Sequence, residues 1–114
     1  MEQIQRQASK KDCDVVNTYA IAAKRAESYG DMVHRDKICD LGIKEYYLRL
    51  MRTNTETPKL SISQRLEVRA KAYKEIAELY GIKGERGLQN VCMRQSELAL
   101  KDAMALANAK RGTD

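Results

Sequence analysis

The sequence predicts an all-α protein, either a four-helix up-and-down bundle or a pair of helical hairpins, that assembles into an oligomer. Ala, Leu, Lys, Glu, Arg and Gln dominate the chain, and all six favour helices. One proline, six glycines and the lack of β-branched runs leave few positions that oppose helix formation. Apolar residues recur at steps of three and four, as on one face of a helix. A length of 114 residues is typical of one domain. We therefore expect a single helical domain over residues 1–114, with frayed ends at about 1–8 and 109–114.

The first expected helix covers residues 2–29 and has a narrow, alanine-rich apolar face. Ala22, Ala23 and Ala26 lie in this face. Small side chains allow a second helix to approach closely. We expect this helix to lie in a tight antiparallel pair or at a subunit contact, and the second possibility is the reason to expect a homo-oligomer.

The second expected helix begins after Gly30 and Asp31 and continues to about Arg52. Glycine accepts the left-handed conformation that often follows a helix, and aspartate is a good cap for the next one. The apolar band of this helix is broad and includes Cys39 and Ile43. A band of this width predicts contact with more than one neighbouring helix.

The third and fourth expected helices follow a polar link that contains Pro58, the only proline. Ser61 or Ser63 is the expected cap of the third helix, whose apolar stripe continues to Tyr80. The three glycines at 81, 84 and 87 are expected to end this helix, and the fourth helix covers residues 88–107. A glycine clamp that holds phosphates, with Lys83 and Arg86 turned toward them, is the alternative to a plain interhelical loop.

The segment from residue 44 to residue 74 holds the excess of positive charge. It contains eight basic and three acidic residues, a balance of +5 that equals the net charge of the whole chain. A cationic segment beside a link between helices favours an anionic partner. The candidate nucleic-acid-binding residues here are Arg49, Arg52, Lys59, Arg65, Arg69, Lys71 and Lys74.

Residues 74–98 resemble a helix-turn-helix. Ala77 is the small residue at the helix crossing, Gly81 forms the turn four residues later, and Ile82 returns to the core. The resemblance implies that the second helix enters the major groove of DNA, which makes DNA a more probable partner than RNA. An ordinary helix that ends in A-x-x-x-G is the alternative. The residues that would face the bases are Arg86, Gln89, Asn90 and Arg94.

The sequence gives no indication of catalysis, of a metal site or of a cofactor. His34 is the only histidine, and its acidic and thiol neighbours in sequence do not have the spacing that a tetrahedral site requires. Cys13, Cys39 and Cys92 are widely separated, which favours reduced thiols in the cytoplasm. No apolar run is long enough to span a membrane. We therefore expect a non-enzymatic cytoplasmic protein.

Two functions fit these features. The first is a nucleic-acid-associated accessory or regulatory protein that uses the mid-chain cations. In outline, the chain resembles the small helical DNA-binding or packaging accessories of phages and mobile elements. The second is a helical protein-interaction module, such as an adaptor, inhibitor or scaffold, with no nucleic-acid role.

Overall fold

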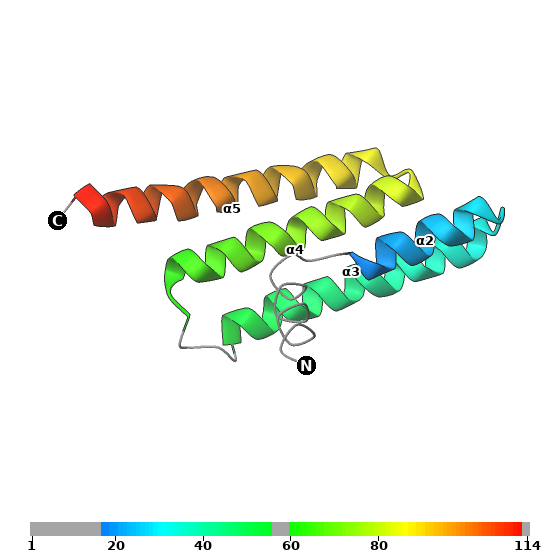
Figure 1. Ribbon diagram of the computed structural model, residues 1–114, viewed down its shortest axis with the longest axis horizontal. Coiled ribbons are helices and arrows are strands. Elements are labelled where there is room, and N and C mark those ends of the chain that lie inside the picture. The colour runs from blue at the N-terminus through cyan, green and yellow to red at the C-terminus, as the bar shows by residue number, and fades with distance from the viewer. Residues whose placement is uncertain (1–16, 56–59, 113–114) are drawn as a thin grey trace, which may run out of the picture.

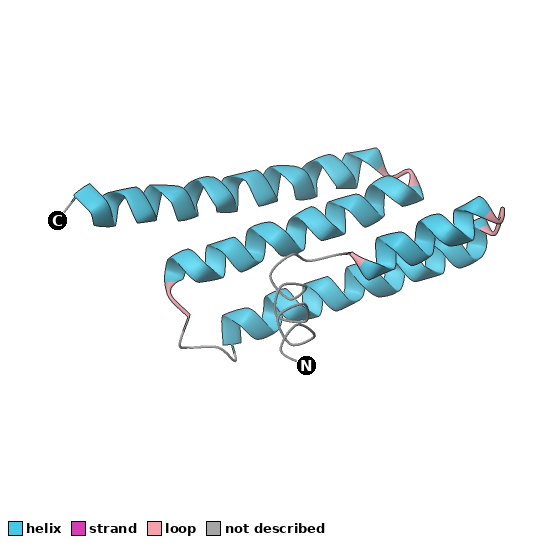
Figure 2. Cartoon of the chain, viewed as in Figure 1, coloured by secondary structure: helices cyan, strands magenta, loops and turns pink. Residues whose placement is uncertain are grey.

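The computed structural model describes residues 17–55 and 60–112, and these residues form four helices joined in an up-and-down order. The helices are α2 (Thr18–Ser28), α3 (Met32–Thr55), α4 (Ile62–Lys83) and α5 (Arg86–Gly112). Figures 1 and 2 show them side by side, with α3, α4 and α5 alternating in direction. The all-α prediction is confirmed. The structure does not describe the link around Pro58 and Lys59 or the first sixteen residues, which include Cys13.

The turn between α2 and α3 forms at Gly30 and Asp31, as the sequence predicted. Gly30 has φ 78°, and its N–H donates to the carbonyl of Glu27 at 2.9 Å. The carboxylate of Asp31 accepts a hydrogen bond of 3.0 Å from the backbone N–H of His34, which caps α3. A left-handed glycine followed by a capping aspartate thus ends one helix and begins the next within three residues.

Helix α4 begins at the predicted cap and ends within the predicted segment of three glycines. The Ser61 side chain accepts from the Gln64 N–H, and the Gln64 side chain accepts from the Ser61 N–H, which completes a capping box. Gly81 does not end the helix, because the backbone stays helical to Lys83 and turns at Gly84, where φ is 83°. The side-chain amide of Gln89 lies where a Cβ of residue 81 would be. The Gln89 amide of α5 thus packs over Gly81, inside the helix.

The core lies between α2, α3 and α4, and its side chains are small. Ile76, Leu79 and Cys39 are the largest fully buried residues of the described chain. Gly42 of α3 lies where the three helices meet, since a Cβ there would be 2.6 Å from Leu79 Cδ1 and 2.7 Å from Tyr19 Cγ. The alanine face of α2 is buried in this core through three residues: Ala20, Ala23 and Ala26. The expectation of a tight helix pair is met inside the chain, so this face does not supply a subunit contact.

Helix α5 extends the array on one side only. Among the described helices its backbone lies close to that of α4 alone, and its buried side chains there are Cys92, Ala99 and Ala103. The Ser96 hydroxyl donates a hydrogen bond of 2.6 Å to the Ala70 carbonyl and fixes the register of the pair. The principal extents are 56, 43 and 23 Å, so the molecule is a slab about two helices thick. None of the described helices is both long enough and apolar enough to cross a membrane.

Candidate interaction surfaces

The larger excess of positive over negative charge lies at one end of the slab. The end of α3, the start of α4 and the second half of α5 meet there (Figure 1). Residues 45–52, 60–74 and 97–109, hereafter the cationic end, contain seven basic and four acidic side chains. Residues 17–44 and 75–96 contain eight basic and seven acidic ones. Charge is therefore distributed along the long axis of the molecule, with the excess at the α3–α4 connection.

The predicted cations of α4 do not form a single edge. Arg69 and Lys71 are separated by about 200° around the helix, because each residue advances the helix by about 100°. Lys74 lies on the side of Lys71, while Arg65, one turn before Arg69, is half-buried on the other side. A flat ligand that contacts one pair cannot contact the other, so these four residues belong to two surfaces.

The predicted cations of α3 occupy a further position. The Arg49 guanidinium lies 5.1 Å from the centroid of the Tyr46 ring and 3.6 Å from the Glu45 carboxylate. Arg52 is exposed one turn closer to the end of α3. Lys59 lies outside the described residues. Arg49 is thus held against α3 by a ring and a carboxylate, which limits its reach toward a ligand.

Three of the four residues predicted to face DNA bases are brought together near the α4–α5 turn. Arg86, Gln89 and Asn90 line a shallow hollow of about 590 Å³ with Glu78 and Gly81. Gln89 is half-buried because its amide covers the glycine. Arg94, the fourth residue of the set, is exposed one turn beyond the hollow.

The helices around this hollow do not have the arrangement of a helix-turn-helix. In that motif the two helices cross at a steep angle, whereas α4 and α5 lie antiparallel over most of their length (Figure 1). The interpretation failed because the turn is at Gly84 and not at Gly81, which lets α5 fold back along α4.

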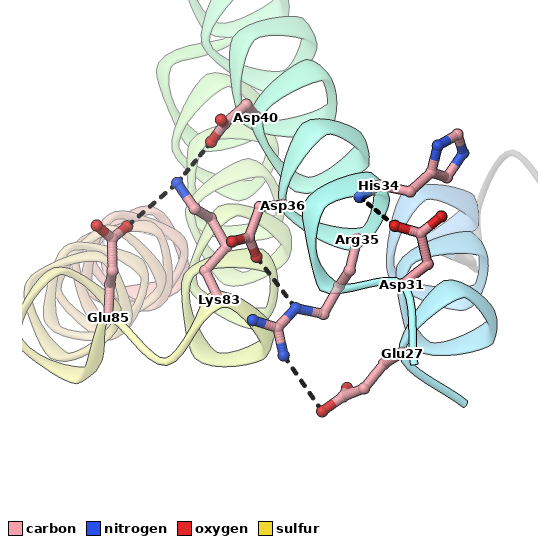
Figure 3. A network of polar contacts seen from close by, with 8 residues as sticks. All are labelled: Glu27, Asp31, His34, Arg35, Asp36, Asp40, Lys83 and Glu85. Carbon is pink, nitrogen blue, oxygen red and sulfur yellow. Dashed lines mark hydrogen bonds and ion pairs between the residues drawn. The ribbon is translucent and has the colours of Figure 1, made fainter. Parts of the chain in front are cut away.

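A polar network closes the opposite end of the slab (Figure 3). Lys83 Nζ lies 2.6 Å from Asp40 and 3.5 Å from Glu85, and so joins α4 to α3 and to the α4–α5 turn. Its hydrogen bond with Asp40 raises the pKa of the lysine. Arg35 contacts Asp36 at 3.0 Å and Glu27 at 3.3 Å. These ion pairs neutralise the cations at this end and hold the α2–α3 and α4–α5 turns in place. They were not identified from the sequence.

Apolar side chains of α3, α4 and α5 are partly exposed along one side of α4. Tyr47 of α3 packs edge-on against Tyr73 of α4, and its hydroxyl interacts with the Cys92 thiol of α5. Leu66 and Leu106 line a hollow of about 530 Å³ farther along. This surface is hereafter the α3–α5 groove. Its hollow lies between α4 and α5 and is lined by Leu66, Asp102, Ala105, Leu106 and Ala109. The surface also includes Tyr47, Ile62, Tyr73 and Leu98.

Helix α5 carries an apolar seam along the wall of this groove. The seam residues recur at alternating steps of three and four, the spacing of helices that pair along their length. This second stripe is distinct from the buried stripe of Cys92, Ala99 and Ala103 that faces α4. The seam consists of Leu88, Val91, Gln95, Leu98, Asp102, Ala105 and Ala109, all of which are exposed.

The described residues hold no cluster of His, Cys, Asp and Glu that suits a metal ion. Cys39 and Cys92 are buried free thiols. Burial raises the pKa of Cys39 to about 11, with the nearby Asp36 carboxylate acting in the same direction. Both side chains pack as small apolar groups in the core cluster.

No protein family, curated protein or solved structure matches this chain.

Proposed function

We propose that this protein is a non-enzymatic helical interaction module whose α3–α5 groove binds a helix of a protein partner. One observation carries the proposal: large apolar side chains from three helices are exposed along one side of α4, beside the hollow between α4 and α5. Their exposed fractions are Tyr47 38%, Ile62 69%, Leu98 44% and Leu106 41%. Isolated apolar residues are normal on surfaces, but a contiguous set is typical of a binding site.

The position of α5 supports the same function. This helix is apolar toward α4 and along the seam, and only the first of these surfaces has a partner helix among the described residues. A helix with apolar residues on more than one side is generally enclosed by more than one neighbour. A helix laid in the groove would supply that neighbour by the mode in which an amphipathic helix fills a groove.

The groove also indicates the charge of its ligand. Arg69 of α4 is exposed and lies one turn from both Leu66 and Tyr73. An apolar helix with a carboxylate at its border would pair with this guanidinium. We therefore propose an amphipathic helix with acidic residues at the edge of its apolar face.

The test compares two variants of the full chain in capture from a nuclease-treated lysate. Ile62→Glu places a carboxylate in the groove, whereas Ile21→Glu makes the same change on the exposed side of α2. We expect Ile62→Glu to lose partners that the wild type and Ile21→Glu both retain. If the partners bind equally to all three proteins, the groove is not the binding surface.

A nucleic-acid-associated accessory protein is the second candidate. The excess of positive charge at the cationic end favours it. Arg69, Lys74 and Lys101 are exposed there and form no ion pair with a carboxylate of the described residues. Phosphates need only cations within reach, and their binding to such a surface would be sensitive to salt.

A further inference from the structure

We infer that the helix bound in the α3–α5 groove is α5 of a second copy of this chain, antiparallel to the first. This inference rests on the proposed function of the groove and specifies its occupant. Two α4–α5 hairpins joined in this way would form a four-helix bundle around the two seams. The argument depends on the position of the charges within the seam.

The seam has its midpoint at Leu98, and this residue fixes the register. When two antiparallel helices are related by a two-fold axis at residue 98, residues equally far before and after it face each other. Val91 of one copy then faces Ala105 of the other, and the two Leu98 side chains meet on the axis. Val91 and Leu98 thereby meet apolar partners, while Leu88 comes level with Asn108 near the ends of the pair.

The same register pairs opposite charges. Arg94 lies four residues before Leu98, and Asp102 lies four residues after it. Arg94 of each copy therefore comes level with Asp102 of the other, which gives two ion pairs related by the two-fold axis. A parallel pair would instead set Asp102 beside Asp102 and Arg94 beside Arg94. The charges thus favour the antiparallel arrangement and explain an acidic residue within an apolar seam.

The expected dimer is a weak one. The seam extends over 22 residues, or about 33 Å of helix, and a helix is about 10 Å wide. Stable dimers bury roughly 800 Å² per partner. The area that one such helix flank and the groove walls would bury is at the lower end of this class. Association should therefore depend on protein concentration.

The first experiment is sedimentation velocity of the full chain at concentrations from about 1 µM to about 1 mM, a range that spans weak association. We expect the mass to rise from 13.0 kDa toward twice that value. Leu98→Glu brings two carboxylates together on the axis and should keep the protein monomeric. Leu100→Glu makes the same change at an exposed residue about 200° around α5 from Leu98 and should still dimerise. Circular dichroism should show the same helix content in all three proteins.

Charge reversal provides the second experiment, because it separates pairing from a general loss of structure. Arg94→Asp and Asp102→Arg each create like charges across the axis, so each alone should weaken the dimer. The double variant restores opposite charges and should recover the association. The inference would be overturned if Leu98→Glu dimerised as strongly as the wild type, or if the double variant associated no more strongly than the single variants.

The outcome also separates this inference from the proposed function. A chain that remains a monomer at every concentration, yet loses captured partners in Ile62→Glu, overturns the second copy as occupant and leaves the groove as a site for another protein. A chain that dimerises as expected and captures no other protein supports the second copy as the partner of the groove.

Discussion

The amide of Asn17 donates a hydrogen bond of 3.2 Å to the backbone carbonyl of Glu75 and thereby joins the start of α2 to the middle of α4. The other side of the same amide accepts from the Ala20 N–H at 3.1 Å and caps α2. One buried side chain thus performs both a local and a long-range task.

We expect Asn17→Ala to lower the free energy of unfolding by about 1–2 kcal/mol, the usual cost of a lost N-cap. Asn17→Ser keeps a capping oxygen and removes the amide donor, so it should recover most of that loss. Chemical denaturation of the three proteins measures both differences. A serine variant as unstable as the alanine variant would show that the bond to α4 dominates.

Glu75 makes stability depend on pH. It is 8% exposed, and no hydrogen-bond donor among the described residues reaches its Oε2. Burial raises the pKa of this carboxyl, and the nearby Glu78 acts in the same direction. Because the folded state binds the proton more tightly than the unfolded state, the carboxyl favours folding at low pH and opposes it once it ionises.

Replacement of this carboxyl by an amide should remove the effect. We expect Glu75→Gln to be more stable than the wild type at neutral pH, with a difference that shrinks as the pH falls through the raised pKa. Thermal unfolding of both proteins from acid to neutral pH tests this. A difference that stays constant across that range would contradict it.

Gly42 should tolerate no side chain. Alanine is the better helix former by about 1 kcal/mol, but its Cβ would be only 2.6 Å from Leu79 Cδ1 in the core. Overpacking of this kind costs about 1–3 kcal/mol, so Gly42→Ala should destabilise the protein. Gly87→Ala, where a Cβ meets nothing within 4 Å, should instead stabilise it. Thermal unfolding of the two variants gives the contrast, and equal shifts would refute the packing argument.

The cationic end gives a direct test of the nucleic-acid candidate. If it binds phosphates, fluorescence polarisation at low salt should detect single- or double-stranded DNA or RNA, with affinity that falls steeply as salt is added. Because Arg69 and Lys71 face opposite sides, Arg65→Glu/Arg69→Glu and Lys71→Glu/Lys74→Glu should differ in their effect. Failure to bind any of the four nucleic acids at low salt would exclude this function.

The helix ends were predictable where local chemistry determines them. Gly30, Asp31 and Ser61 each act within a few residues of their own position, so the sequence suffices to place them. Gly81 was misinterpreted because its role depends on Gln89, a neighbour on another helix that comes into contact only after folding.

The surfaces were less predictable for the same reason. The excess of cations was readable from composition, but their gathering at one end depends on how three helices align. The α5 seam could have been found, since Leu88, Val91 and Leu98 have regular helical spacing.

The packing of α5 at the edge of the molecule, chiefly against α4, has a consequence for hydrogen exchange. Separation of α5 from α4 would leave the contacts among α2, α3 and α4 in place. The amides of α5 can therefore exchange through a local opening whose free energy is lower than that of global unfolding. The amides near Ile76 and Leu79 exchange only when the whole molecule unfolds. Any molecule that occupies the groove would close this route and bring the exchange of α5 closer to that of the core.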